Sequence, residues 1–301
     1  MTRFPTIIAA VCSLLGTSLQ AQVSAPTTRP LELGTTPPLV IERVDGSESS
    51  EIEPPEAEET NEWETDRDSF TPSTKTAGRR RLILESAYSF VDHRAVKETH
   101  SFPEFLARYG LGDRFELRLG WNYEVGGEGS SVSSSTSDDE TSPTGSLIRD
   151  SKINYGFKVG VTEQCRLIPE SALIVAGFTP TSGDKSTTEF IGTYVFGWEL
   201  PNRWKLDSAL RFAADSEEGE TFQDWAPSIV LKAPIGEKWD AHVEYFGLFS
   251  SGKEQDRVAH YISPGLHYLL GENLEVGIRL GWGLNDQASR FFSNVGVGVR
   301  F

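Results

Sequence analysis

The chain has 301 residues, a net charge of −16 and 38% apolar residues. This acidity, with no basic run longer than Arg79–Arg81, excludes a surface for nucleic-acid phosphates. Cys12 and Cys165 are too few for a zinc cluster, so we expect neither metal nor cofactor. No stretch approaches the roughly 20 apolar residues of a membrane-spanning helix, which excludes a helical membrane protein.

Residues 1–21 have the pattern of a secretory signal peptide. Arg3 supplies an early positive charge, an apolar stretch covers residues 7–15, and a polar end leads to Ala21. Cleavage after Ala21 leaves a mature chain with one thiol, on Cys165, and therefore without an intramolecular disulfide.

The next segment, residues 22–77, is acidic and rich in proline. It holds thirteen Asp or Glu residues against four Lys or Arg residues. A segment of this composition buries too little apolar surface to offset the entropy lost on ordering. We therefore expect a disordered tether in the periplasm.

From Gly78 to Phe301 apolar and polar residues alternate, which predicts strands with one apolar and one polar face. In the last stretch, for example, Val295, Val297 and Val299 alternate with Gly296 and other small or polar residues. The twelve predicted strands cover residues 80–91, 99–110, 114–124, 150–160, 167–178, 187–199, 203–214, 222–233, 237–249, 257–270, 273–284 and 290–301.

The connections between these strands alternate between tight turns, such as 110–113 and 201–202, and longer polar loops, such as 92–98 and 125–149. This alternation is typical of a bacterial barrel with short periplasmic turns and long outer loops. An even number of strands also places both ends of the barrel on the short-turn side. The sequence predicts an all-β fold, a transmembrane antiparallel up-and-down β-barrel of about 12 strands.

Six tryptophans of the predicted barrel fall into two sets that share the outward parity of their strands. Trp198, Trp204 and Trp239 lie beside tight turns, whereas Trp121, Trp225 and Trp282 lie at the long-loop ends. Two such rings are typical of aromatic girdles at the two membrane interfaces. The alternative, a soluble β-sandwich with scattered core tryptophans, gives no reason for two sets of tryptophans at opposite ends of the strands. We expect a barrel in the bacterial outer membrane, surrounded by outer-membrane lipid.

The opposite parity places charged residues on the inner face of the barrel. The candidates that line this lumen are Glu85, Arg108, Glu116, Arg118, Lys158, Arg211, Glu244 and Arg279. Charges are costly in lipid but tolerable in a paired, hydrated interior. Two interpretations stay open: ion pairs that rigidify a narrow barrel, and a polar path for small solutes.

The predicted strands bring no nucleophile next to a base. Ser263 and His267 share a face but stand about 13 Å apart along an extended strand, and His260 points the other way. The sequence has no nucleophile elbow, no H-E-x-x-H helix and no phosphate-binding loop. We therefore expect no enzymatic activity.

The stretch RYGLGDRFELRLG, residues 108–120, resembles the hallmark of an outer-membrane barrel family labelled as transporters or as "meta-pathway phenol degradation" proteins. Residues 78–85, 155–158 and the terminal VGVRF fit the same family. The resemblance covers residues 78–301, with Gly112 where the family has threonine. It implies passage of small hydrophobic or aromatic compounds. The lumen residues that it carries over by position are Glu85, Arg108, Glu116, Arg118 and Lys158.

The sequence thus predicts an outer-membrane channel or transporter for small solutes, with hydrophobic or aromatic compounds implied by the resemblance alone. The alternative is a closed structural or adhesive barrel that binds a partner through its loops or tether and transports nothing. The resemblance also implies a second partner, the barrel-assembly machinery, which would read the terminal Phe301 as an assembly signal.

Overall fold

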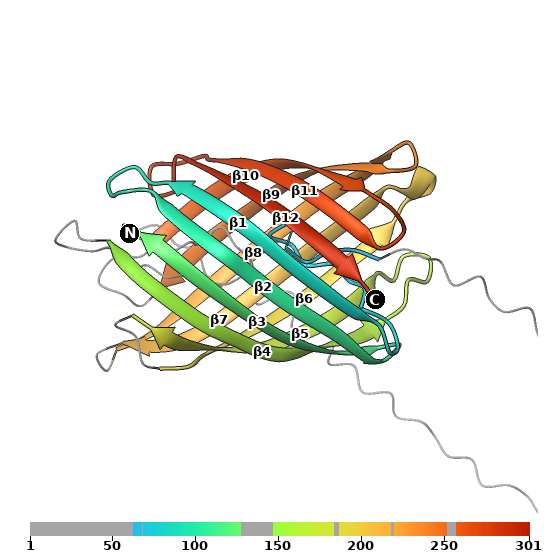
Figure 1. Cartoon of the computed structure of the whole chain (residues 1–301), viewed down its shortest axis with the longest axis horizontal. Helices are drawn as coiled ribbons and strands as arrows, with labels where there is room; N and C mark the ends of the chain where they lie inside the picture. Colours follow the sequence, from blue (N-terminus) through green and yellow to red (C-terminus); the bar gives the residue numbers. More distant parts are fainter. Residues whose placement is uncertain (1–62, 68, 128–146, 184–186, 218–219, 252–256) are drawn as a thin grey trace, which may run out of the picture. The chain divides into compact units, whose positions relative to one another are not determined.

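The computed structural model describes residues 63–67, 69–127, 147–183, 187–217, 220–251 and 257–301 (Figure 1). The predicted signal peptide, residues 22–62 of the predicted tether and most of the loop 125–149 lie outside these residues. Among the described residues, no helix has the length and apolar character needed to cross a membrane.

The described residues form one closed antiparallel barrel, in which each strand pairs with its neighbours in sequence (Figure 1). The strands are β1 (Leu82–Asp92), β2 (Thr99–Gly112), β3 (Phe115–Gly126), β4 (Ile148–Thr162), β5 (Glu170–Ser182), β6 (Glu189–Glu199), β7 (Lys205–Glu217), β8 (Glu220–Ile235), β9 (Trp239–Ser251), β10 (Arg257–Leu269), β11 (Leu274–Gly283) and β12 (Phe291–Arg300). A short 3-10 turn, η3 (Pro201–Arg203), joins β6 to β7. The predicted twelve-stranded barrel is confirmed, with strand ends shifted by a few residues.

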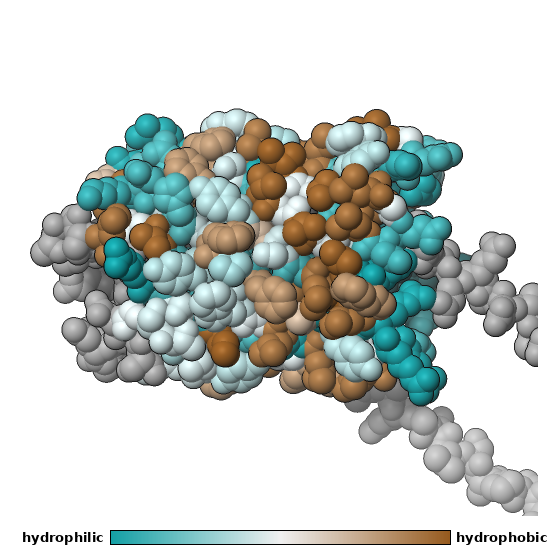
Figure 2. Space-filling view, viewed as in Figure 1, coloured by the Kyte–Doolittle hydropathy of each residue, from teal (hydrophilic) through white to brown (hydrophobic). Residues whose placement is uncertain are grey.

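The alternation of residues along each strand separates an outer from an inner face. In β3, Leu117, Leu119 and Trp121 are exposed on the outside, whereas Glu116, just before them, is buried inside. Figure 2 shows apolar side chains gathered over the middle of the wall and hydrophilic side chains at its two ends. An apolar band between polar ends is the surface that a lipid bilayer requires of a barrel.

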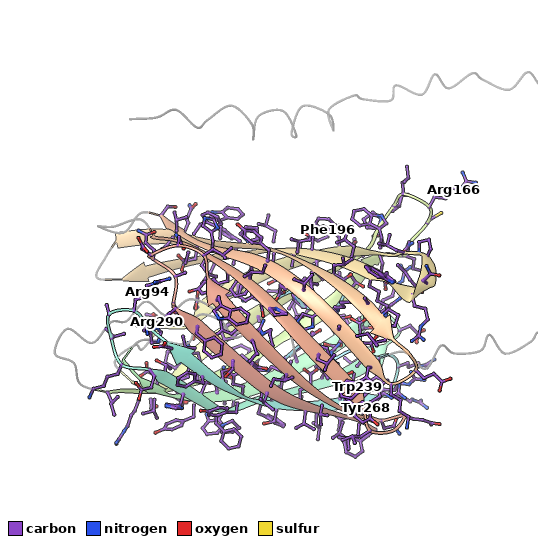
Figure 3. The ribbon with its side chains drawn as sticks, turned by 90° about the horizontal axis from the view of Figure 1, so that it is seen from above. Arg94, Arg166, Phe196, Trp239, Tyr268 and Arg290 are labelled. Carbon is purple, nitrogen blue, oxygen red and sulfur yellow. The ribbon has the colours of Figure 1, made fainter. Side chains whose placement is uncertain are left out.

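All six barrel tryptophans lie on the outer wall near strand ends, and five of them are 38–44% exposed. Trp239 packs against Tyr268 at the short-turn end, with ring centroids 4.4 Å apart. Figure 3 shows this pair at the end of the barrel opposite to Arg94 and Arg290. The positions match the two expected levels, and their role as membrane girdles stays a prediction.

The barrel closes where β1 pairs with β12, from Ile83 opposite Arg300 to Asp92 opposite Phe291. Beyond this ladder, Phe301 exchanges two backbone hydrogen bonds with Leu82, of 2.8 and 3.1 Å. The C-terminus therefore lies at the short-turn rim, beside the start of the first strand (Figure 1).

The expectation of a disordered tether is wrong for its last part. Residues 63–67 and 69–77, which we call the lumen segment, are ordered inside the barrel, shown in blue in Figure 1. Asp66, Phe70 and Thr71 are each at most 1% exposed. The expectation failed because it weighed apolar burial only, whereas charged groups of the inner wall hold this segment.

The lumen segment leaves the barrel through a sharp turn at the short-turn rim. Gly78 has a φ of +80°, a left-handed conformation that favours glycine. Any side chain on Gly110 of β2 would meet the backbone carbonyl of Gly78. Glycine at both positions therefore lets the chain fold back tightly from the lumen into β1.

Candidate functional site

The structure places all eight predicted lumen candidates on the inner wall. Seven are at most 5% exposed, and the side chain of Arg118 is 11% exposed. They form two groups around the lumen segment. The first group spans β1 to β4 and contains Glu85, Arg108, Glu116, Arg118 and Lys158; the second spans β7 to β11 and contains Arg211, Glu244 and Arg279.

The first group is an ion-pair cluster centred on Arg108. The guanidinium of Arg108 donates to Glu85 at 3.0 Å and to Glu116 at 3.0 and 3.1 Å. Arg118 donates to Glu116 at 2.8 Å, and Lys158 lies opposite Glu116 in the β3–β4 register. The antiparallel register of four adjacent strands thus brings hallmark residues that are distant in sequence into one network.

Asp66 of the lumen segment completes this cluster. Its carboxylate accepts hydrogen bonds from Arg118 at 2.6 Å and from Lys158 at 3.4 Å, and it lies 3.7 Å from Nη1 of Arg108. Its backbone N–H donates to Glu85 at 2.8 Å. Buried charges are tolerable only when they are paired in this way, so the segment and the wall depend on each other.

Sequence reasoning missed Asp66, although a signal for it existed. The residues that the resemblance carries over are three cations, Arg108, Arg118 and Lys158, and only two carboxylates, Glu85 and Glu116, although the same four strands also bury Glu104, Glu124 and Lys152. A buried cluster of this kind requires a further anion, which the acidic segment before β1 supplies.

The second group holds the innermost part of the lumen segment. Glu244 accepts hydrogen bonds from the backbone N–H groups of Phe70 and Thr71, at 2.9 and 2.6 Å, and from the Thr71 hydroxyl at 2.7 Å. Arg279 also donates to Glu244, at 3.1 Å. Arg211 donates to the Phe70 carbonyl at 3.2 Å, and its guanidinium lies 4.3 Å from the centre of the Phe70 ring.

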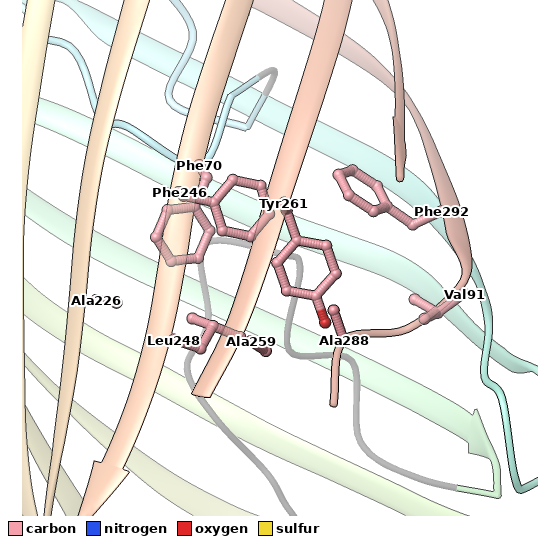
Figure 4. Close-up of a cluster of buried hydrophobic side chains, with 9 residues drawn as sticks. All are labelled: Phe70, Val91, Ala226, Phe246, Leu248, Ala259, Tyr261, Ala288 and Phe292. Atoms are coloured by element: carbon pink, nitrogen blue, oxygen red, sulfur yellow. The ribbon is translucent and has the colours of Figure 1, made fainter. Parts of the chain in front are cut away.

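An aromatic cluster surrounds Phe70 inside the barrel (Figure 4). The Phe70 ring stacks on Phe246, with centroids 4.3 Å apart and an interplanar angle of 8°. Tyr261 stacks on the same Phe246 ring at 4.8 Å, and Phe292 meets Tyr261 edge-on at 5.9 Å. These aromatic residues have inward parity, and sequence reasoning missed them because it searched that face for charges only.

The lumen segment is also tied to the wall at the short-turn mouth of the barrel. Glu64 accepts hydrogen bonds from Lys205 and Lys232, both at 2.7 Å. A cavity of about 520 Å³ opens beside it, lined among others by Trp63, His242 and His267. A second cavity of about 710 Å³ opens at the same end, beside Lys75, Arg79, Arg81 and Arg114. The mouth is therefore hollow on two sides of the segment.

The residues weighed in the sequence, Ser263, His260 and His267, do not form a nucleophile–base pair, whereas a buried hydrogen bond of 3.3 Å joins the Ser289 hydroxyl to Nδ1 of His93, whose Nε2 faces the Thr99 hydroxyl at 2.9 Å. The Ser263 hydroxyl donates to the backbone carbonyl of Leu280 at 2.9 Å, while His267 faces His242 at 2.8 Å and His260 faces Tyr245 on the outer wall. In the part of the chain that the structure describes, no three His, Cys, Asp or Glu side chains gather in an arrangement that would hold a metal ion.

Acid should loosen the mouth of the lumen segment through Glu64. Burial opposes ionisation of this carboxyl, but Lys232 and Lys205 outweigh burial and hold its pKa well below the ordinary value of 4.5. A lowered pKa stabilises the docked segment fully above pH 4.5 and loses this effect as the pH falls through the pKa of the docked group. We expect amide protection at residues 63–67, measured by hydrogen exchange and corrected for intrinsic rates, to fall in that acidic range.

The matched control is Glu64→Gln, which keeps the shape of the side chain and removes the titrating group. The protection that this variant retains should depend less steeply on pH. An identical pH profile in the two proteins would contradict the assigned role of Glu64.

The apolar outer wall, the charged interior and the closed twelve-stranded topology define an outer-membrane β-barrel. A family model described as "Putative MetA-pathway of phenol degradation" matches residues 65–301, and the chain belongs to this family. The match begins at residue 65 and not at the first strand, so the lumen segment is part of the family's domain. The resemblance seen in the sequence is confirmed and extended by these residues.

The solved structures that this barrel resembles are distant from it in sequence. The COG4313 outer membrane channel from Pseudomonas putida F1 is 9% identical with a TM-score of 0.53, over 76% of this chain and 98% of that one. The NanC porin is 9% identical with a TM-score of 0.47, over 72% of this chain and 98% of that one. A search of curated protein sequences finds no match. The structure of the COG4313 channel supports the barrel fold, and the family match supports the extent of the domain, residues 65–301.

Proposed function

We propose that this protein is a channel for small solutes in which the lumen segment is a gate. One observation carries the proposal: the lumen is occupied by a stretch of chain that precedes β1, and not only by side chains of the strands themselves. Movement of this one stretch would open a passage lined by the charged inner wall. The membership of the family and the fold shared with an outer membrane channel support this function.

The contacts that hold the segment suit a gate. Ion pairs and hydrogen bonds join Glu64, Asp66 and the backbone at Phe70 and Thr71 to seven strands, β1 to β4 and β7 to β9. Water can replace such contacts when the segment leaves, because a hydrogen bond to a charged group contributes about 1.5–3 kcal/mol net once its partners become hydrated. The largest apolar contact of the segment is the Phe70 cluster, and Pro72 and Ala77 are buried as well.

We propose hydrophobic or aromatic compounds as the solutes. The Phe70 ring stacks on Phe246 beside Tyr261, so the inner wall offers a flat aromatic surface wherever Phe70 moves away. A stacked aromatic pair is worth about 0.5–1.5 kcal/mol beyond its buried area, which favours ring-shaped solutes. The family description, which names phenol degradation, supports the same class of compound.

The filled lumen also favours a second candidate function, a closed structural or adhesive barrel that transports nothing. Single-channel recording in planar bilayers separates the two functions. A folded, heat-modifiable barrel that shows no openings under any applied voltage would contradict the channel and support the closed barrel. Openings that depend on the position of the lumen segment would support the gated channel.

We propose that residues 22–62 lie in the periplasm. Trp63 donates its indole N–H to the Glu272 carbonyl, at 3.0 Å, in the short turn between β10 and β11. Short turns face the periplasm in bacterial barrels, so this contact supports a periplasmic entry for the chain. Outer-membrane lipid around the apolar wall is part of the same proposal.

We further propose that the barrel-assembly machinery reads Phe301, whose side chain is 68% exposed at the rim. Phe301→Ala keeps the two backbone hydrogen bonds to Leu82 and removes the ring. The amount of heat-modifiable barrel in the outer membrane should fall several-fold, while conductance per folded barrel stays the same. Phe301→Tyr is the control and should assemble normally. Normal accumulation of Phe301→Ala would refute the assembly role.

A further inference from the structure

A small cavity lies inside the barrel between the lumen segment and the inner wall. Its volume is about 50 Å³. Three arginines, Arg67, Arg118 and Arg211, line one part of it. The other part is apolar and formed by Leu106, Ile174, Ala176, Phe178 and Ile191. Asp66, Asn154 and Thr193 also line the polar part, and the Asp66 carboxylate is already paired with Arg118 and Lys158. The cavity therefore joins a polar side with a net positive charge to an apolar side.

Two of the arginines have hydrogen-bond donors that nothing in the described chain accepts. Arg67 is 4% exposed, and its Nη2 donates to the Phe105 carbonyl at 2.8 Å and to Asn122 at 3.3 Å. Its Nε and Nη1 are buried without a partner. Arg211 is 5% exposed and uses Nη2 on the Phe70 carbonyl, while its Nη1 is also buried without a partner.

The third arginine differs from these two. Arg118 is paired with both Asp66 and Glu116, at 2.6 and 2.8 Å. No described carboxylate lies within ion-pair distance of Arg67 or Arg211. A guanidinium stays charged at any physiological pH, so the wall holds two buried positive charges whose donors are incompletely satisfied. Leaving a buried charged donor unpaired is costly, and an anion in the cavity would remove that cost.

The cavity also indicates which anion fits. A planar carboxylate accepts two parallel hydrogen bonds from a guanidinium, which a spherical halide cannot do. The apolar side offers contact to a short alkyl group, and a water molecule needs about 10–15 Å³ of such space, so the cavity admits an occupant equal to only a few waters. This combination favours a carboxylate with a short chain over a phosphate or a long amphiphile.

We propose that this cavity binds a short-chain monocarboxylate, with the carboxylate between Arg67 and Arg211 and the alkyl group against β5 and β6. The site belongs to the closed barrel, with the lumen segment in place, because Arg67 is part of that segment. It therefore stands independently of whether the barrel conducts solutes.

Calorimetric titration of the folded, full-length mature barrel in detergent tests the site. Sodium propionate should bind saturably, sodium chloride more weakly, and propan-1-ol, which has no charge, not at all. The absence of saturable propionate binding would overturn the proposal. Equal affinity for chloride and propionate would overturn the carboxylate class.

Two variants examine the cavity from its two sides. Arg211→Gln should weaken propionate binding at least about tenfold, the factor that corresponds to loss of about 1.4 kcal/mol. Ala176→Leu fills the cavity from β5 without changing any charge, and it should abolish binding. If Arg211→Gln does not fold, Ala176→Leu still tests whether propionate binds in this cavity.

The matched control is Arg290→Gln at the outer rim. Arg290 is exposed and pairs with Asp92 at 3.4 Å, and neither residue lines the cavity. This variant should bind propionate as the unchanged protein does. Propionate binding that survives Ala176→Leu at full affinity would place the site elsewhere and refute the assignment.

Discussion

Replacing Arg108 by glutamine should lower the free energy of unfolding of the barrel by about 3–5 kcal/mol, the range expected when one member of a buried charge cluster is removed. Arg108 is 1% exposed and binds Glu85 and Glu116 at 3.0 Å. It also donates to the backbone carbonyls of Glu64 and Lys75. The substitution leaves two buried carboxylates short of a cation and weakens the lumen segment at both ends.

Denaturant unfolding of the barrel in detergent, followed by heat modifiability, measures this loss. The control is Arg114→Gln, because Arg114 pairs with Glu163 at the surface, where the two side chains are 56% and 80% exposed. Exposed pairs contribute about 0–1 kcal/mol, so the control should unfold almost as the unchanged protein does. Equal losses in the two variants would show that the buried cluster does not determine stability.

Linking the lumen segment to the wall by a disulfide should abolish channel openings. A Cβ atom on Gly298 of β12 would contact the Thr65 methyl group, so cysteines at the two positions lie within reach of a disulfide. The double variant Thr65→Cys, Gly298→Cys is made in a Cys165→Ser background, because Cys165 is an exposed free thiol. Openings in planar bilayers should disappear on oxidation and return on reduction.

The two single-cysteine variants in the same background are the controls, since Gly298→Cys alone presses on Thr65 and Trp63. Neither should respond to oxidant. A double variant that conducts equally in its oxidised and reduced forms would show that the lumen segment is not the gate. Loss of openings in Gly298→Cys alone would instead attribute the effect to the added side chain.

The barrel itself could be predicted from the sequence because its signal is local and repeated. In β3, Glu116, Leu117 and Leu119 show an inner and an outer face within four positions, and most strands repeat the alternation. The strand number then fixes closure between β1 and β12. The same alternation along the strands predicts that Arg108 and Lys158 point into the lumen. The residues that the barrel wall contributes to the site could therefore be predicted.

The lumen segment could not be predicted in this way. Its contacts, such as that of Phe70 with Glu244 or of Thr65 with Glu275, join residues 174 and 210 positions apart in the chain. No periodic pattern within the segment signals these partners, and they meet only because the barrel closes around them. Composition alone predicts that residues 63–77 are solvated, because it gives no information on the ion-pair and hydrogen-bond partners that strands distant in sequence provide.

The position of the lumen segment has a consequence for the order in which the barrel is built. The partners of Asp66 on the barrel wall all lie on β1 to β4, so its cluster requires only the first third of the barrel. The contacts at Glu244 and Glu275 require β9 and β11, which come much later in the chain. Short chain separations close at lower entropic cost, so the Asp66 cluster is the favoured early contact. The later strands then fold around a lumen segment that is already bound to β1 to β4.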